Sequence, residues 1–102
     1  MEILRFERLE EKKKQYLAIY DIANDVRRRK ISKHFEEYGM RIQESAFLMI
    51  LDDRKYRSFI SRIPYLIEER EDAVWINRIY PEDVEKFGYK QTITCGFDAM
   101  II

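Results

Sequence analysis

Tyr16-Leu17-Ala18-Ile19-Tyr20-Asp21-Ile22 is the stretch of the 102-residue sequence on which the predicted fold depends. Every residue in it except Asp21 is apolar. Because neighbouring side chains of a strand point to opposite faces, both faces of this strand are apolar, which is typical of the centre of a covered sheet. Asp21 shares a face with Leu17 and Ile19. A carboxylate at the end of a buried strand needs a hydrogen bond, a cation or a metal ion.

The composition is that of one small domain. Apolar residues make up 46% of the chain and charged residues 37%, with a formal net charge of zero. No overall field attracts a polyanion, so any affinity for nucleic acid must come from local segregation of charge. Cys95 is the only cysteine, which excludes an internal disulfide and a cysteine-based metal site.

The sequence also predicts a soluble cytoplasmic protein with no membrane attachment. Charged residues begin at Glu2, which is unlike a signal peptide. The longest apolar run, residues 46–51, is far too short to span a bilayer.

Hydrophobic periodicity and helix caps divide the chain into elements. Asn24 is a predicted N-cap, and Gly39 is expected at C′ of the same helix, where the left-handed conformation is common. One bent strand over 40–51 is an alternative to two short ones. The predicted order is a charged leader (1–14), a strand (15–22), a helix (25–38), strands at 40–43 and 45–51, a helix capped by Asp52 and Asp53, a strand (73–80) and a C-terminal strand (91–102).

This β-α-β-β-α-β order predicts an α+β, ferredoxin-like domain over residues 15–90, with an antiparallel sheet and both helices on one face. That packing leaves the second face of the sheet uncovered. Since the first strand is apolar on both faces, a second copy of the chain is the simplest cover.

Five cations fall close together in the first predicted helix, with no acid among them. They predict either a solvated helix face or a surface for sequence-independent contact with phosphates. Among these cations, Arg28 is one turn before Ile31 and borders the buried face near the end of the first strand, so its side chain is expected to reach toward Asp21. The candidate nucleic-acid-binding residues are Arg27, Arg28, Arg29, Lys30 and Lys33.

Two motifs carry a resemblance to a known family. One is Tyr20-Asp21-Ile22 followed by Asp25 and Arg28, and the other is the segment 41–47 directly after Gly39. Together they resemble the small spacer-acquisition protein of CRISPR systems, CRISPR-associated protein two. By position in these motifs, the residues that carry over as catalytic or supporting are Tyr20, Asp21, Arg28, Arg41, Ser45 and Phe47.

The resemblance implies a homodimer of face-to-face sheets, with the strand at 91–102 pairing with the partner's sheet. It implies that the dimer holds duplex DNA and bridges the larger CRISPR integrase. Some members of that family are metal-dependent ribonucleases or deoxyribonucleases, which implies a Mg²⁺ or Mn²⁺ site at Asp21 in the dimer cleft.

Each candidate also has a structural interpretation. Asp21 can accept hydrogen bonds from the following helix or pair with Arg28 or Arg41, and Tyr20 and Phe47 can be core aromatics. The only histidine, His34, is expected in the core rather than as a general base. We therefore expect a DNA-binding scaffold. The alternative is a metal-dependent endoribonuclease, including one of the virulence-associated toxin type.

Overall fold

The computed structural model describes residues 12–88. The predicted strand at 91–102 lies outside this range, as does nearly all of the predicted leader over 1–14.

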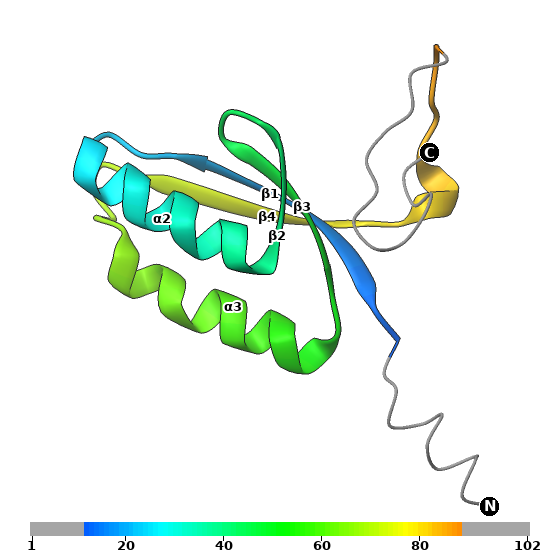
Figure 1. Ribbon diagram of the computed structural model, residues 1–102, viewed down its shortest axis with the longest axis horizontal. Coiled ribbons are helices and arrows are strands. Elements are labelled where there is room, and N and C mark those ends of the chain that lie inside the picture. The colour runs from blue at the N-terminus through cyan, green and yellow to red at the C-terminus, as the bar shows by residue number, and fades with distance from the viewer. Residues whose placement is uncertain (1–11, 89–102) are drawn as a thin grey trace, which may run out of the picture.

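The described chain forms a four-stranded antiparallel sheet and two long helices, which confirms the predicted α+β, ferredoxin-like order (Figure 1). The strand order is β2-β3-β1-β4, so the strand that contains residues 16–21 lies between two neighbouring strands. The elements are β1 (Lys14–Asp21), α2 (Asp25–Tyr38), β2 (Gly39–Gln43), β3 (Ala46–Leu51), α3 (Asp53–Leu66), β4 (Ala73–Ile79) and the 3₁₀ turn η1 (Pro81–Asp83).

Side-chain caps set the starts of both helices. The Asn24 side chain accepts a hydrogen bond from the Arg27 backbone N–H at 2.9 Å, and Asp52 accepts one from Lys55 N–H at 2.8 Å. Each cap satisfies a backbone donor that the first turn of a helix leaves free. The helix starts predicted from Asn24 and Asp52 are therefore confirmed.

Gly39 ends α2 as predicted, but its backbone conformation differs from the expected one. Its φ of −157° is extended rather than left-handed, and Gly39 is also the first residue of β2. Glycine is needed there because a Cβ would lie 2.5 Å from the Leu48 carbonyl oxygen on the neighbouring strand. A turn at Glu44 and Ser45 separates β2 from β3, so the alternative of a single bent strand is wrong.

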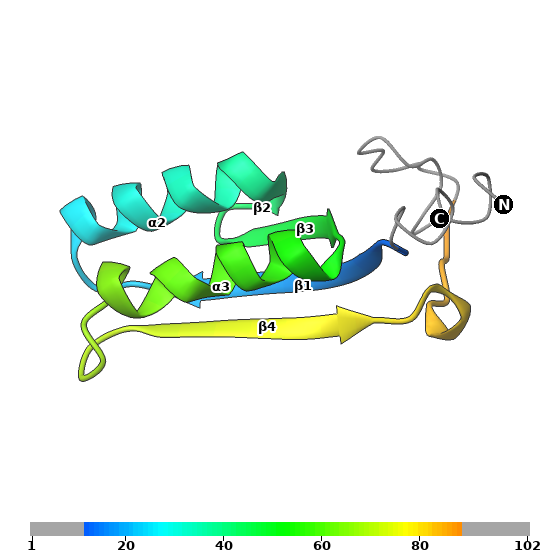
Figure 2. The same ribbon diagram turned by 90° about the horizontal axis from the view of Figure 1, so that it is seen from below.

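The core lies between the helices and one face of the sheet (Figure 2). Phe35 of α2 is fully buried, with its ring centroid 5.3 Å from that of Tyr20, 5.4 Å from Phe47 and 5.1 Å from Phe59. His34 is buried beside it, with Nε2 2.9 Å from the Phe59 carbonyl oxygen. The expectation that His34 belongs to the core is confirmed.

Neither α2 nor α3 covers the other face of the sheet (Figure 2). Leu17 and Ile19 of β1 point to this face, because Tyr16, Ala18 and Tyr20 point into the core. In the register, Ile19 lies opposite Trp75 of β4, whose side chain is 51% exposed. An apolar sheet face with an exposed tryptophan is therefore open within residues 12–88. Within that range neither helix is long and apolar enough to cross a membrane.

Candidate functional site

Asp21 is the last residue of β1 and is exposed to solvent. It lies opposite Ala73 in the register and, by alternation, on the open face of the sheet. Its carboxylate makes no hydrogen bond or ion pair with any residue of the described range 12–88. Neither partner considered from the sequence, Arg28 or Arg41, is used. The carboxylate is therefore free to bind a cation or another donor.

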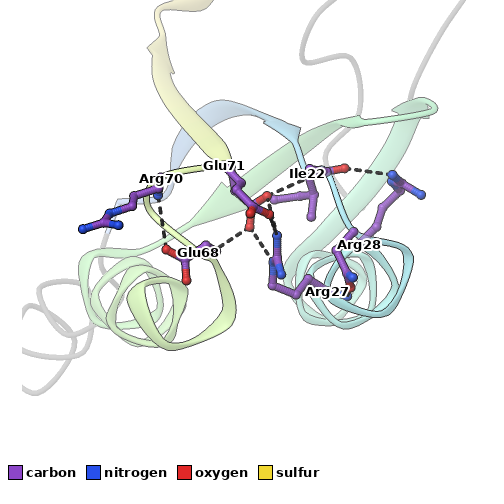
Figure 3. Close-up of polar contacts among 9 residues, drawn as sticks. Ile22, Arg27, Arg28, Glu68, Arg70 and Glu71 are labelled. Carbon is purple, nitrogen blue, oxygen red and sulfur yellow. Dashed lines mark hydrogen bonds and ion pairs between the residues drawn. The ribbon is translucent and has the colours of Figure 1, made fainter.

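A shallow pocket of about 290 Å³ lies where β1 ends and the β2–β3 turn begins. Four of the residues proposed from the sequence meet there; its lining is Tyr20, Asp21, Ile22, Arg28, Glu44 and Ser45. Arg28 donates from Nη2 to the Ile22 carbonyl oxygen at 2.8 Å, and from Nη1 to the Asp25 carboxylate (Figure 3). Arg28 thus fixes the backbone next to Asp21 rather than neutralising its charge.

Arg41 reaches the rim of this pocket from β2. Its Nη1 donates to the Glu44 carbonyl oxygen, while Nη2 donates to Ser32 Oγ at 2.6 Å and Glu36 Oε2 at 3.0 Å. The hydrogen bond with Glu36 is the main cause of the raised pKa of Arg41. The guanidinium also lies 4.8 Å from the centre of the Phe47 ring. Arg41 therefore joins α2 to the β2–β3 turn.

The two aromatic candidates lie in the core. Phe47 is fully buried and does not line the pocket. Tyr20 is 5% exposed, and its hydroxyl lies 3.4 Å from the Glu44 carbonyl oxygen at the pocket edge. Ser45 contributes its backbone, because its carbonyl oxygen accepts the Tyr20 N–H at 3.1 Å.

Arg27 lies in a different environment from the other cations of α2. Its Nε donates to Asp72 Oδ2 at 2.7 Å and its Nη2 to Glu71 Oε1 at 2.8 Å (Figure 3). Asp72 is the centre of this contact: its side chain is fully enclosed and also accepts the backbone N–H groups of Ala23 at 3.0 Å and Glu68 at 2.7 Å. Arg27 therefore ties the start of α2 to the turn before β4.

The hydrogen bond with Arg27 is the main cause that holds the pKa of Asp72 well below its usual range, and the same contact raises the pKa of Arg27. The sequence alone did not indicate this contact between Arg27 and Asp72. The signal that could have identified Asp72 is its position directly before β4, whose pairing with β1 brings it beside the N-terminus of α2.

The remaining cations of α2 are exposed. Arg29, Lys30 and Lys33 make no hydrogen bond or ion pair through their side chains within the described part of the chain. Sequence reasoning missed that α3 adds a second set with the same property, namely Arg54, Lys55, Arg57 and Arg62. Their polar positions beside the apolar stripe of α3 could have shown them. The helix layer thus carries cations on both helices.

The described residues contain no cluster of three or more histidine, cysteine or acidic side chains that could hold a metal ion. Any metal site at Asp21 would therefore use fewer than three such side chains from the described residues of one chain. Mg²⁺ can bind through one or two protein carboxylates while keeping several waters, so one Asp21 per chain is a partial match to such a site.

The family model for CRISPR associated protein Cas2 matches residues 14–87. A CRISPR-associated endonuclease Cas2 from Thermus thermophilus is 38% identical over 68% of this chain and 73% of its own length. A CRISPR-associated endoribonuclease Cas2 from Chloroflexus aurantiacus is 43% identical over 63% of this chain and 70% of its own length.

Solved structures agree with these relatives. The hypothetical protein TT1823 from Thermus thermophilus aligns with a TM-score of 0.65 and 29% identity, over 81% of this chain and 93% of that one. Cas2 from Streptococcus pyogenes has the same fold, with a TM-score of 0.62 and 23% identity, over 72% of this chain and 99% of that one. Since the family model matches nearly all of the described residues, this chain belongs to the CRISPR-associated Cas2 family.

Proposed function

We propose that the protein acts in CRISPR adaptation as a homodimeric scaffold that binds duplex DNA without regard to base sequence and bridges the larger CRISPR integrase. The observation that carries the proposal is the division of the molecule into an open apolar sheet face and a cationic helix face. Family membership supplies the CRISPR context.

The sheet face suits a second copy of the same chain. Leu17, Ile19 and Trp75 give this face a large apolar area, and burying such area is the main favourable term in protein association. Packing two copies face to face leaves both helix layers outward. The cations of α2 then occur twice in the dimer.

The helix face suits phosphates. Arg29, Lys30 and Lys33 are exposed and have no partner within residues 12–88. Contacts of such cations with phosphate oxygens position a duplex and carry no sequence information. Arg27 was part of the candidate set, but its guanidinium is held by Asp72 and Glu71, so we restrict the proposed contacts to the other three.

Changing Arg29, Lys30 and Lys33 together to alanine is expected to lower the affinity for duplex DNA about tenfold or more at 0.1 M salt. The loss should be about equal for unrelated sequences, and it should flatten the dependence of affinity on salt. Fluorescence anisotropy with two unrelated duplexes measures both. The matched control exchanges the same residues as Arg29→Lys, Lys30→Arg and Lys33→Arg, which keeps the charges and should keep the salt dependence. An alanine variant that binds like the wild type would place the DNA elsewhere.

A second candidate function is a metal-dependent endonuclease, favoured by the exposed and unpartnered carboxylate of Asp21 and by the names of the relatives. In a face-to-face dimer, two copies of Asp21 could bind one Mg²⁺ or Mn²⁺ ion. A bound ion would supply electrostatic stabilisation of a phosphodiester undergoing cleavage. Residues 12–88 contain no cluster of three or more possible metal ligands, and His34 lies in the core, so this is the weaker candidate.

Incubation of RNA and duplex DNA with the protein and Mg²⁺ separates the two functions. If the protein is a scaffold, we expect the wild type and the Asp21→Asn variant to give the same result, with no cleavage that depends on Asp21. Gel analysis of end-labelled substrates, with EDTA as the control, measures this. Cleavage lost both in EDTA and in the Asp21→Asn variant would establish the nuclease instead.

A further inference from the structure

A groove of about 380 Å³ lies between α2 and α3 on the outer surface of the helix layer. The two helices run side by side there (Figure 1). The groove is lined by Lys30, Lys33, His34, Glu37, Arg62 and Leu66. Cations from both helices therefore face one hollow, although Arg62 lies far from the others in the sequence.

The charge in this groove is not balanced by the described residues. Lys30, Lys33 and Arg62 have no hydrogen bond or ion pair through their side chains within residues 12–88, and Glu37 is the one carboxylate in the lining. These three cations differ from Arg27 and Arg41, whose guanidinium groups are held by carboxylates. Like charges gathered without a counter-ion repel each other, so binding of an anion in the groove is favourable.

The floor of the groove is buried. His34 stacks on Phe59, with ring centroids 5.2 Å apart, and the proximity of its Nε2 to the Phe59 carbonyl oxygen assigns the ring proton to that nitrogen. Both residues are buried, so the bottom of the groove is part of the core. The contact between His34 and Phe59 joins α2 to α3 directly beneath the cations.

The row of cations extends beyond the groove. Lys30 and Lys33 also line a neighbouring pocket on the other side of the α2 ridge, together with Arg29. An extended row of cations fits a chain of phosphates better than a single small anion. The guanidinium of Arg62 adds a planar donor set that can contact two phosphate oxygens at once.

We propose that the groove between α2 and α3 binds the phosphate backbone of duplex DNA, with Arg62 as the contact that α3 supplies. This rests on the proposed scaffold function, and it extends the DNA path from the outer ridge of α2 across to α3. A duplex seated in the groove of one chain meets one Arg62, which contributes about −0.9 to the slope of log K against log salt.

The test compares three single variants in salt titrations with one duplex. Arg62→Ala is expected to reduce the magnitude of the slope by about 1, and Arg62→Lys to retain most of it. Arg70→Ala is the matched control, because it removes the same charge from the exposed turn before β4 and should leave the slope unchanged. Thermal melting checks that all three variants are folded.

An unchanged slope for Arg62→Ala would overturn the groove proposal. If the triple variant of α2 still lost affinity in that case, the scaffold function would stand without the groove. Equal losses for Arg62→Ala and Arg70→Ala would also overturn it, since they would indicate a general effect of net charge. The last experiment uses inorganic phosphate as a competitor. If phosphate displaces DNA only at an ionic strength at which chloride displaces it equally well, the groove is a site for the DNA backbone. Displacement by phosphate at low millimolar concentration would indicate a site for the free anion and would overturn the proposal.

Discussion

Replacing Phe35 by alanine is expected to lower the free energy of unfolding by about 3–5 kcal/mol. The Phe35 side chain is fully buried, and its ring packs edge-on against Tyr20, Phe47 and Phe59, each from a different element. Removing it leaves a cavity where β1, β3 and both helices meet, because the surrounding rings cannot all collapse inward. Domains of this size have a total stability of about 5–15 kcal/mol, so the variant should be close to unfolding.

Urea unfolding followed by circular dichroism measures this loss. The matched control is Val26→Ala on the same helix, where the side chain is half exposed and the expected change is within about 0.5 kcal/mol. A Phe35→Ala variant with an unfolding midpoint equal to that of Val26→Ala would contradict the packing described for the core.

Replacing Asp72 by asparagine is expected to lower the free energy of unfolding more than substitutions in surface turns usually do. The enclosed carboxylate accepts hydrogen bonds from Arg27, Ala23 and Glu68. The amide of asparagine keeps the shape but places an N–H₂ group against one of these donors and removes the charge that holds Arg27. Breaking an enclosed, fully satisfied network is among the few changes that destabilise strongly.

The effect should depend on pH in a defined direction. The pKa of Asp72 is held well below its usual range in the folded protein, chiefly by Arg27. The ionised carboxylate therefore contributes stability that is fully present above the unfolded pKa of about 3.9 and is lost as the pH falls through the lower folded pKa. Asparagine does not titrate, so the difference in stability between the two proteins should be constant above about pH 5 and should shrink below about pH 4.

Melting temperatures of both proteins between pH 3 and pH 7 test this. Glu71→Gln is the control, because Glu71 is the exposed partner of Arg27 and its loss should cost much less. A difference between wild type and Asp72→Asn that stays constant down to pH 3 would show that Asp72 is not the ionised centre of this network.

Features set by local sequence were predictable. The starts of α2 and α3 followed from Asn24 and Asp52, because a cap depends on the adjacent turn alone. The apolar spacing of α3 is also a local helical pattern, and Phe59 and Ile63 within it are buried. Local patterns of this kind act within a few residues, so the order of the elements could be read from the chain.

Features set by distant parts of the chain were not predictable. Gly39 is required by the approach of the Leu48 carbonyl from the next strand, and a glycine after a helix gives the same sequence signal for a left-handed cap. Arg27 and Asp72 meet only because β4 pairs with β1. The same holds for Arg62, whose position opposite Lys30 and Lys33 follows from helix packing.

The central claim is that a dimer of this chain binds duplex DNA through its cations and without a metal ion. Titration of a duplex with the wild-type protein in EDTA, repeated over a series of salt concentrations, tests it most directly. Two or three phosphate contacts per chain in a dimer predict retained binding and a slope of log K against log salt of about −4 to −5. Loss of binding in EDTA, or a slope of only about −2, would contradict the claim.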